Sequence, residues 1–157
     1  REILVHYLKP LGVTVFETAN GIEALELLNQ TAVEAVISDI TMPQMNGIEL
    51  LTEIRLRHPE LPVVIVSAHA DKENMRNCLR LGALDFLEKP YSEDEVQSVV
   101  NRAIEIGARR RHIRMLQASS TSQADESAAV ALNREKRMVQ LLLVKDSNGK
   151  KKQASGE

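Results

Sequence analysis

The sequence predicts an α/β fold in which helices cover both faces of a mostly parallel sheet. Helical and strand-like segments alternate over about residues 1–115. The segment at residues 63–66 is entirely apolar, which is typical of a parallel strand that is buried on both faces. The composition, with 43% hydrophobic and 27% charged residues, is that of an ordinary globular domain with a buried core.

The first predicted elements are a helix, a strand and a second helix. Apolar residues at helical spacing open the chain, and this pattern stops around Pro10 and Gly12. The β-branched content of residues 13–18 predicts a strand. Asn20 is a suitable N-cap for the next helix, and Glu23 at its third position completes a capping box.

The middle of the chain predicts two strands joined through a helix. A short apolar strand over residues 35–38 is followed by a Pro-containing loop over residues 41–46. The helix after this loop ends at His58-Pro59, because the residue before a proline avoids the helical region. The apolar strand at 63–66 comes next.

Two further helices and one strand complete the alternating region. Asp71 is a suitable cap for a helix, and Gly82 is a natural residue to end it. Residues 84–87 predict the last short strand. Ser92 and Glu95 form another capping box, which starts a long amphipathic helix.

The composition changes from Gln117, so we expect one domain over residues 1–116 and a linker with a tail over 117–157. Residues 118–127 are polar and contain too little apolar surface to fold by themselves. The body of the chain is acidic and its end is basic. We interpret the basic end as a solvated extension of the domain. Nucleic acid is not expected as a partner, because only 3% of residues are aromatic and Trp is absent.

Cysteine content and hydropathy exclude two classes of protein. The one cysteine, Cys78, excludes an internal disulfide framework, and we interpret it as a small apolar helix residue. No apolar run approaches the roughly 18 residues that a membrane span requires, and no signal-peptide pattern opens the chain. A cytoplasmic protein is therefore expected.

Three reactive side chains follow three successive strands. Asp39, Ser67 and Lys89 each come directly after or near the end of a predicted strand. The carboxyl ends of parallel strands share one edge of a sheet, so these side chains are expected to converge in one crevice. A carboxylate is a competent nucleophile toward a phosphoryl group, and a hydroxyl with an ammonium can hold the transferred oxygens. Each residue alone is weak evidence, but their order, with Pro90 after the lysine, is specific.

Three segments that contain these residues resemble response-regulator receiver domains of two-component systems. Residues 36–51 are similar to the phosphorylation loop, 64–68 to the fourth strand with its switch hydroxyl, and 82–90 to the fifth strand with its Lys-Pro signature. The resemblance covers about residues 1–115. It implies a flavodoxin-like, doubly wound parallel sheet with strand order 2-1-3-4-5.

The resemblance also implies a role for individual residues. Asp39 is the expected phosphoacceptor, supplied by a sensor histidine kinase or a phosphotransfer protein. Ser67 and Lys89 are expected to hold the phosphoryl group, and Phe86 matches the aromatic switch. Asp39 and the Thr41 carbonyl are expected to bind Mg²⁺. Such a module signals through its partner-binding face and catalyses at most its own phosphorylation and dephosphorylation.

Two smaller features accompany the match. The Lys89–Pro90 peptide bond is expected to be cis, as in the family. Asn46 stands where an aspartate is commoner in this loop, and we expect this departure to matter little.

The match breaks at the start of the domain. Receivers carry a central first strand followed by a pair of acidic residues, and this sequence opens inside the first helix. Without that pair, Mg²⁺ is expected to bind weakly or not at all. The absence of the strand also leaves two open edges inside the sheet, and we interpret the chain as an N-terminally truncated receiver.

The tail contains a segment that could replace the missing strand. Residues 141–148 are similar to a receiver first strand and its loop, with Asp146 as one acidic residue and Lys145 in place of the other. Residues 138–146 are therefore a permuted first strand, the opening of a second receiver, or part of a helix. We favour an amphipathic helix over 128–144, because Leu132, Val139 and Leu142 fall at helical spacing.

Two other functions remain open at this point. A degenerate receiver would bind partners without being phosphorylated, and loss of the acidic pair favours that hypothesis. A phosphohydrolase of the haloacid-dehalogenase type also uses an aspartate after a strand, but it needs a second acid two residues later, where this chain has Thr41. We discount the phosphohydrolase.

Overall fold

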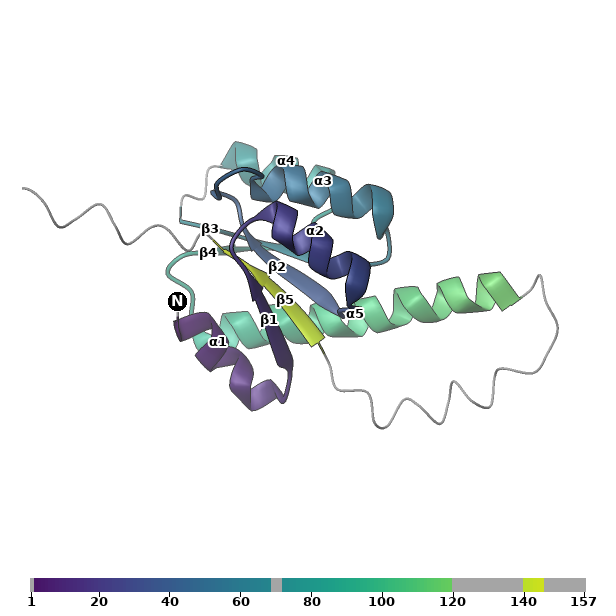
Figure 1. Cartoon of the computed structure of the whole chain (residues 1–157). Helices are drawn as coiled ribbons and strands as arrows, with labels where there is room; N and C mark the ends of the chain where they lie inside the picture. Colours follow the sequence, from purple (N-terminus) through teal and green to yellow (C-terminus); the bar gives the residue numbers. More distant parts are fainter. Residues whose placement is uncertain (1, 69–71, 120–139, 146–157) are drawn as a thin grey trace, which may run out of the picture.

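The computed structural model describes residues 2–68, 72–119 and 140–145. Five parallel strands form one sheet in the order β1-β5-β2-β3-β4 (Figure 1). The strands are β1 (Thr14–Thr18), β2 (Ala35–Asp39), β3 (Val63–Ser67), β4 (Asp85–Glu88) and β5 (Gln140–Val144). The helices are α1 (Glu2–Leu8), the 3₁₀ turn η1 (Lys9–Leu11), α2 (Gly21–Gln30), α3 (Gly47–Arg57), α4 (Lys72–Arg80) and α5 (Glu93–Ser119).

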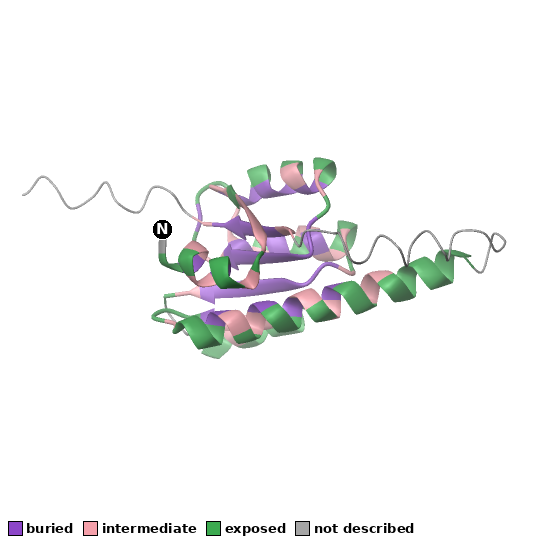
Figure 2. Ribbon diagram, turned by 90° about the horizontal axis from the view of Figure 1, so that it is seen from below, coloured by how far each residue is buried: buried purple, intermediate pink, exposed green. Residues whose placement is uncertain are grey.

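The helices cover the sheet on both faces, as predicted. Helices α1 and α5 lie on one face, and α2, α3 and α4 lie on the other (Figure 1). Each face has its own buried core, and the three central strands, β5, β2 and β3, are buried along most of their length (Figure 2). Cys78 is fully buried in the layer with α2 to α4, and burial raises the pKa of its thiol.

The predicted capping residues begin two of these helices. Asn20 accepts a hydrogen bond from the backbone N–H of Glu23 at 3.0 Å, at the start of α2. At α5, the Glu95 N–H donates to Ser92 Oγ at 3.3 Å, and Ser92 N–H donates back to Glu95 Oε2 at 2.8 Å. The Ser92 N–H and the Ser92 hydroxyl, which donates to Glu95 Oε2 at 2.9 Å, lower the pKa of Glu95 because they favour its ionised form. Asp71, the third predicted cap, lies outside the described residues.

The prediction of a helix over 128–144 is wrong for its last residues, because Gln140–Val144 is a strand. It pairs in parallel with β1 on one side and with β2 on the other. The two neighbouring strands offer it backbone partners on both edges and apolar layers on both faces. Four consecutive apolar residues, 141–144, are all buried in this place, whereas a helix would bury only one stripe of them.

Strand β5 occupies the central position that the resemblance assigns to the missing first strand. The predicted open edges inside the sheet are therefore absent among the described strands. Residues 120–139, which connect α5 to β5, include the rest of the predicted helix and lie outside the described residues. The division into residues 1–116 and 117–157 stays a prediction.

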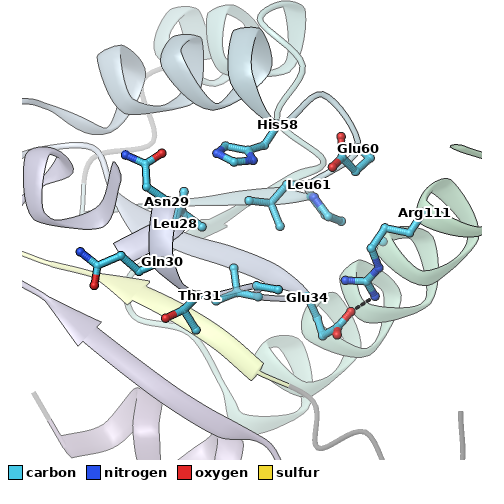
Figure 3. A pocket seen from close by; sticks show the side chains of 13 residues that line it. Leu28, Asn29, Gln30, Thr31, Glu34, His58, Glu60, Leu61 and Arg111 are labelled. Carbon is cyan, nitrogen blue, oxygen red and sulfur yellow. Dashed lines mark ion pairs between the residues drawn. The ribbon is translucent and has the colours of Figure 1, made fainter. Parts of the chain in front are cut away.

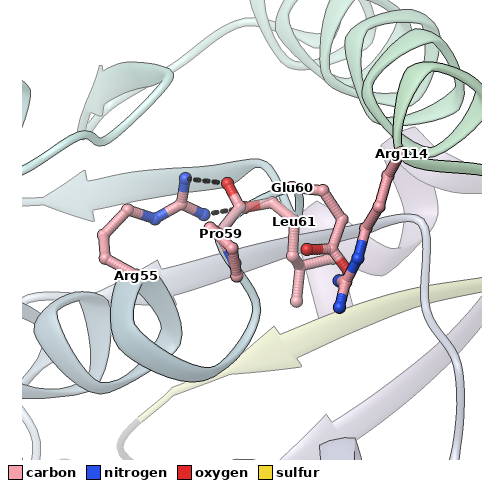
Figure 4. Close-up of polar contacts among 5 residues, drawn as sticks. All are labelled: Arg55, Pro59, Glu60, Leu61 and Arg114. Atoms are coloured by element: carbon pink, nitrogen blue, oxygen red, sulfur yellow. Dashed lines mark hydrogen bonds and ion pairs between the residues drawn. The ribbon is translucent and has the colours of Figure 1, made fainter. Parts of the chain in front are cut away.

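Two ion pairs attach the last turns of α5 to the amino-terminal edge of the sheet. Arg111 pairs with Glu34, whose side chain is only 6% exposed (Figure 3). Arg114 Nη1 lies 2.7 Å from Glu60 Oε1. Arg55 donates to the carbonyl oxygens of Pro59 and Leu61, on either side of Glu60 (Figure 4). These two pairs hold α5 against the domain as far as Arg114.

We expect Arg111→Ala to lower the free energy of unfolding by about 3 kcal/mol, because the buried Glu34 carboxylate would lose a charged partner. Arg109→Ala is the matched control on the same helix, since Arg109 pairs with Glu105 on the exposed surface. That change should cost about 0.5 kcal/mol or less. Urea unfolding followed by circular dichroism measures both, and equal costs for the two variants would contradict this account.

Candidate functional site

The carboxyl edge of the sheet brings two of the predicted reactive side chains into contact. Asp39 ends β2, and Lys89 directly follows β4, two strands away. Lys89 Nζ lies 2.9 Å from Asp39 Oδ1, and the Asp39 side chain is 18% exposed. The carboxylate is therefore accessible enough to react and already close to a positive charge.

Backbone hydrogen bonds hold these two residues at the edge. The Lys89 N–H donates to the carbonyl oxygen of Ser67, the last residue of β3, at 2.8 Å. The Ile40 N–H, directly after Asp39, donates to the Val66 carbonyl at 3.0 Å. The Lys89–Pro90 bond is cis, as expected. The third predicted residue, Ser67, thus lies between the other two strands, half-buried at the same edge.

Gly47 is a site residue that we did not single out from the sequence. A Cβ atom at this position would lie 2.2 Å from the Asp39 carbonyl oxygen, which is too close for any side chain. The Gly47 N–H donates to the Ile40 carbonyl at 2.8 Å, so the loop turns back onto the end of β2. Asn46 caps α3 here by accepting from the N–H groups of Ile48 and Glu49. Its side chain therefore serves the helix start.

Thr41 and Phe86 lie around this edge in different environments. Thr41 is exposed in the loop after β2. Phe86 is partly buried and packs against the core layer of α2 to α4. Their predicted roles, in metal binding and in switching, stay predictions.

A second ion pair lies near the same edge of the sheet, between β1 and β5. Lys145 directly follows β5, and its N–H donates to the Thr18 carbonyl at 3.1 Å. Its Nζ lies 2.8 Å from Glu17 Oε2, and its side chain is only 14% exposed. Lys145 was expected to stand in place of an acid, but its pairing with Glu17 was not predicted. Asp146 lies outside the described residues.

These residues fit a magnesium ion poorly. Within residues 2–68, 72–119 and 140–145, no group of three or more His, Cys, Asp or Glu side chains could hold a metal. Asp39 is paired with Lys89, and Glu17 is paired with Lys145. Mg²⁺ prefers near-octahedral oxygen ligands, and two ammonium groups at the edge oppose its charge. We therefore derive no step through a metal ion.

The pKa of Tyr91 depends in part on the charge of Asp39. Burial, the Asp39 carboxylate and Tyr7 together raise the pKa of Tyr91, in that order of size. A negative charge nearby disfavours the tyrosinate form. Because its pKa is raised in the folded state, Tyr91 contributes to the free energy of unfolding in its neutral form. This contribution is complete below a pH of about 10, the ordinary tyrosine pKa, and is lost as the pH rises through the raised pKa of Tyr91.

We expect Asp39→Asn to lower the pKa of Tyr91, because it removes the second of these causes. The chain has two tyrosines, so Tyr7→Phe in both proteins leaves Tyr91 as the only tyrosine. The absorbance of tyrosinate during an alkaline titration gives the pKa directly. An unchanged or raised value in the Asp39→Asn protein would show that the two groups do not interact.

A cavity of about 350 Å³ lies at the opposite, amino-terminal edge of the sheet. Asn29, His58 and the Glu34–Arg111 pair are among its lining residues (Figure 3). Glu34 precedes β2 and Asp39 ends it, so the strand separates the cavity from the reactive edge by roughly 16 Å. The cavity takes no part in the site at Asp39.

Comparison with known proteins identifies the family. Residues 1–101 match the family described as the response regulator receiver domain. The chain belongs to this family. Its flavodoxin-like fold is thereby confirmed, with β5 in the position that was expected to be empty. Receiver domains are signalling modules, and they generally bind Mg²⁺ at the phosphorylation site.

Named relatives come from the same group of regulators. The chain is 41% identical over 104 residues to the DNA-binding transcriptional regulator NtrC of Escherichia coli K12, covering 66% of this chain and 22% of the relative. It is 35% identical over 113 residues to a putative NtrX-like response regulator of Rickettsia bellii, covering 71% and 24%. The chain therefore spans about a quarter or less of the length of these curated relatives.

A solved structure also supports the assignment to the receiver family. The receiver domain of NtrX from Brucella abortus superposes with a TM-score of 0.63 at 35% identity, covering 66% of this chain and 88% of that one. Because NtrC is named as DNA-binding, the expectation that nucleic acid is not a partner gains no support from the relatives. Among the helices that the structure describes, none is both long and apolar enough to cross a membrane.

Proposed function

We propose that this receiver accepts a phosphoryl group on Asp39 from a sensor histidine kinase or a phosphotransfer protein. The observation that supports this most is the Lys89 Nζ to Asp39 Oδ1 contact of 2.9 Å at the carboxyl edge of the sheet. A partly exposed carboxylate beside an ammonium group suits attack on phosphorus followed by charge stabilisation of the product. Cytoplasmic location is part of the same proposal.

The transfer follows from ordinary acyl-phosphate chemistry. An Asp39 carboxylate oxygen attacks the phosphorus of a phosphohistidine, the P–N bond breaks, and its electron pair returns to the imidazole ring. Lys89 then neutralises part of the charge on the transferred oxygens, with Ser67 as a further donor. The phosphoryl group adds about −1.5 to −2 charges at this edge.

The added charge would bias the partner-binding face. In this proposal Ser67 turns toward the phosphoryl group, and Phe86 moves further into the layer that it already contacts. The change would reach α4, β4 and α5, which lie next to these residues in the fold. Phosphorylation would thereby alter which partner this face binds.

A degenerate receiver is the second candidate, and one observation favours it. Lys145 places a positive charge where the resemblance implies an acid, so the usual metal-assisted reaction lacks ligands among the described residues. Such a domain would bind partners without phosphorylation. The phosphohydrolase gains nothing, because the residue two after Asp39 is the exposed Thr41.

Intact-protein mass spectrometry distinguishes the two candidates. The protein is incubated with acetyl phosphate, with and without Mg²⁺, and then with its cognate phosphodonor if one is found. The proposed function predicts the gain of one phosphoryl group in wild type and no gain in Asp39→Asn. A wild-type protein that gains none under any of these conditions would favour the degenerate receiver.

A further inference from the structure

Four charged side chains of alternating sign lie along the carboxyl edge of the sheet. Glu17 is on β1, Lys145 follows β5, Asp39 ends β2, and Lys89 follows β4. Glu17 pairs with Lys145 at 2.8 Å, and Asp39 pairs with Lys89 at 2.9 Å. The formal charges of these four side chains cancel, so this described row offers an incoming divalent cation no net negative charge.

Lys145 is within reach of the reactive carboxylate. Ser38 pairs with Val144 in the sheet, so Asp39 and Lys145 are the next residues on adjacent strands. Adjacent strands lie about 4.8 Å apart, a shorter distance than an extended lysine side chain. Side chains alternate along a strand, so both residues share the face of Ile37 and Leu143, toward α1 and α5.

The ion pair between Glu17 and Lys145 can open at small cost. The Glu17 side chain is 38% exposed, whereas that of Lys145 is 14% exposed. Glu17 would therefore regain hydration if the pair opened, and an ion pair with one partner at the surface contributes only about 1 kcal/mol. A phosphoryl group on Asp39 carries more charge than the Glu17 carboxylate and would attract the ammonium more strongly.

We propose that Lys145 supplies the second positive charge at the phosphoryl group, so that Asp39 is phosphorylated without a divalent cation. This inference rests on the proposed phosphoacceptor function. With acetyl phosphate, an Asp39 oxygen forms a bond to phosphorus, the bond from phosphorus to the acetate oxygen breaks, and acetate leaves with the electron pair. Lys89 and Lys145 hold the transferred oxygens from two sides, and Glu17 returns to solvent.

The first test uses the full wild-type chain and acetyl phosphate, with either EDTA or excess Mg²⁺. The gain of a phosphoryl group is followed by intact mass over time. We expect similar rates in the two media. Labelling only in Mg²⁺ would overturn this inference and leave the proposed function intact, whereas no labelling in either medium would overturn both.

Variants of Lys145 test the residue itself. Lys145→Gln should lower the metal-free rate by about tenfold or more, because one donor to the developing charge is lost. Lys145→Asp should lose metal-free labelling and gain Mg²⁺ binding in calorimetry, which wild type should lack. Lys9→Asp makes the same charge change at an exposed lysine and should behave as wild type in both respects.

Circular dichroism of each variant shows whether the sheet is intact. Lys145→Gln keeps a long polar side chain at this position and is expected to keep the fold, so it decides the matter if Lys145→Asp does not fold. A folded Lys145→Gln protein with an unchanged metal-free rate would overturn the inference. Mg²⁺ binding to wild type in calorimetry would also overturn it.

Discussion

Replacing Leu142 with aspartate is expected to unfold the domain. Leu142 is fully buried at the centre of β5, between β1 and β2, in the layer of α2 to α4. The change removes an apolar side chain worth about 2 kcal/mol of burial and puts an unpaired charge in its place. The combined loss of about 5 kcal/mol or more approaches the whole stability of an ordinary domain.

Leu56→Asp is the matched control for this experiment. The Leu56 side chain is 74% exposed on α3, so the same substitution there should change the free energy of unfolding by about 0.5 kcal/mol or less. Far-ultraviolet circular dichroism and urea unfolding compare the two variants. A Leu142→Asp protein with the wild-type unfolding midpoint would show that β5 does not occupy the centre of the sheet in solution.

Asp39→Asn is expected to abolish phosphorylation, because an amide oxygen is not a nucleophile toward phosphorus under these conditions. The shape of the side chain is kept, and the 18% exposed position tolerates the neutral group, so the fold should persist. Asp94→Asn, in the first turn of α5 and exposed, is the matched control and should be phosphorylated like wild type. The amount of phosphoryl group gained, by intact mass, measures both.

Lys89→Ala is expected to slow phosphorylation of Asp39 but not to abolish it. Its ammonium lies 2.9 Å from the Asp39 carboxylate, so its loss should slow labelling by about a hundredfold without abolishing it. The site assigned here would be wrong if Asp39→Asn retained labelling. The role of Lys89 would be wrong if its alanine variant matched wild type.

Local signals in the sequence were sufficient for most of the elements. The cap of α2 by Asn20 and the reciprocal Ser92–Glu95 bonds are set by residues three positions apart, so they could be predicted without tertiary information. The contact of Asp39 with Lys89 followed from a topological rule, because parallel strands put their carboxyl ends at one edge.

Strand β5 could not be predicted in the same way. Residues 141–144 are apolar without a break, and a short run of this kind fits a buried strand or a buried helix equally well. Its state is decided by the slot between β1 and β2, whose residues lie more than a hundred positions earlier in the chain. For residues 140–144, tertiary context thus overrode the helical spacing that Leu142 shares with Leu132 and Val139.

The long-range ion pairs were also beyond the reach of local patterns. Glu34 with Arg111, and Glu17 with Lys145, join residues whose proximity depends on strand register and on how far α5 continues. For Lys145 one signal did exist, namely a lysine in the position of an expected acid. That signal identified an unusual residue but could not indicate its partner.

Covalent attachment of a phosphoryl group to Asp39 is the central claim for this receiver domain. Borohydride reduction of the labelled protein converts an aspartyl phosphate to homoserine, and peptide mass spectrometry then locates the converted residue. We predict conversion at Asp39, and at no other aspartate, after treatment with acetyl phosphate. Conversion at another residue, or none in a protein that circular dichroism shows to be folded, would contradict the account.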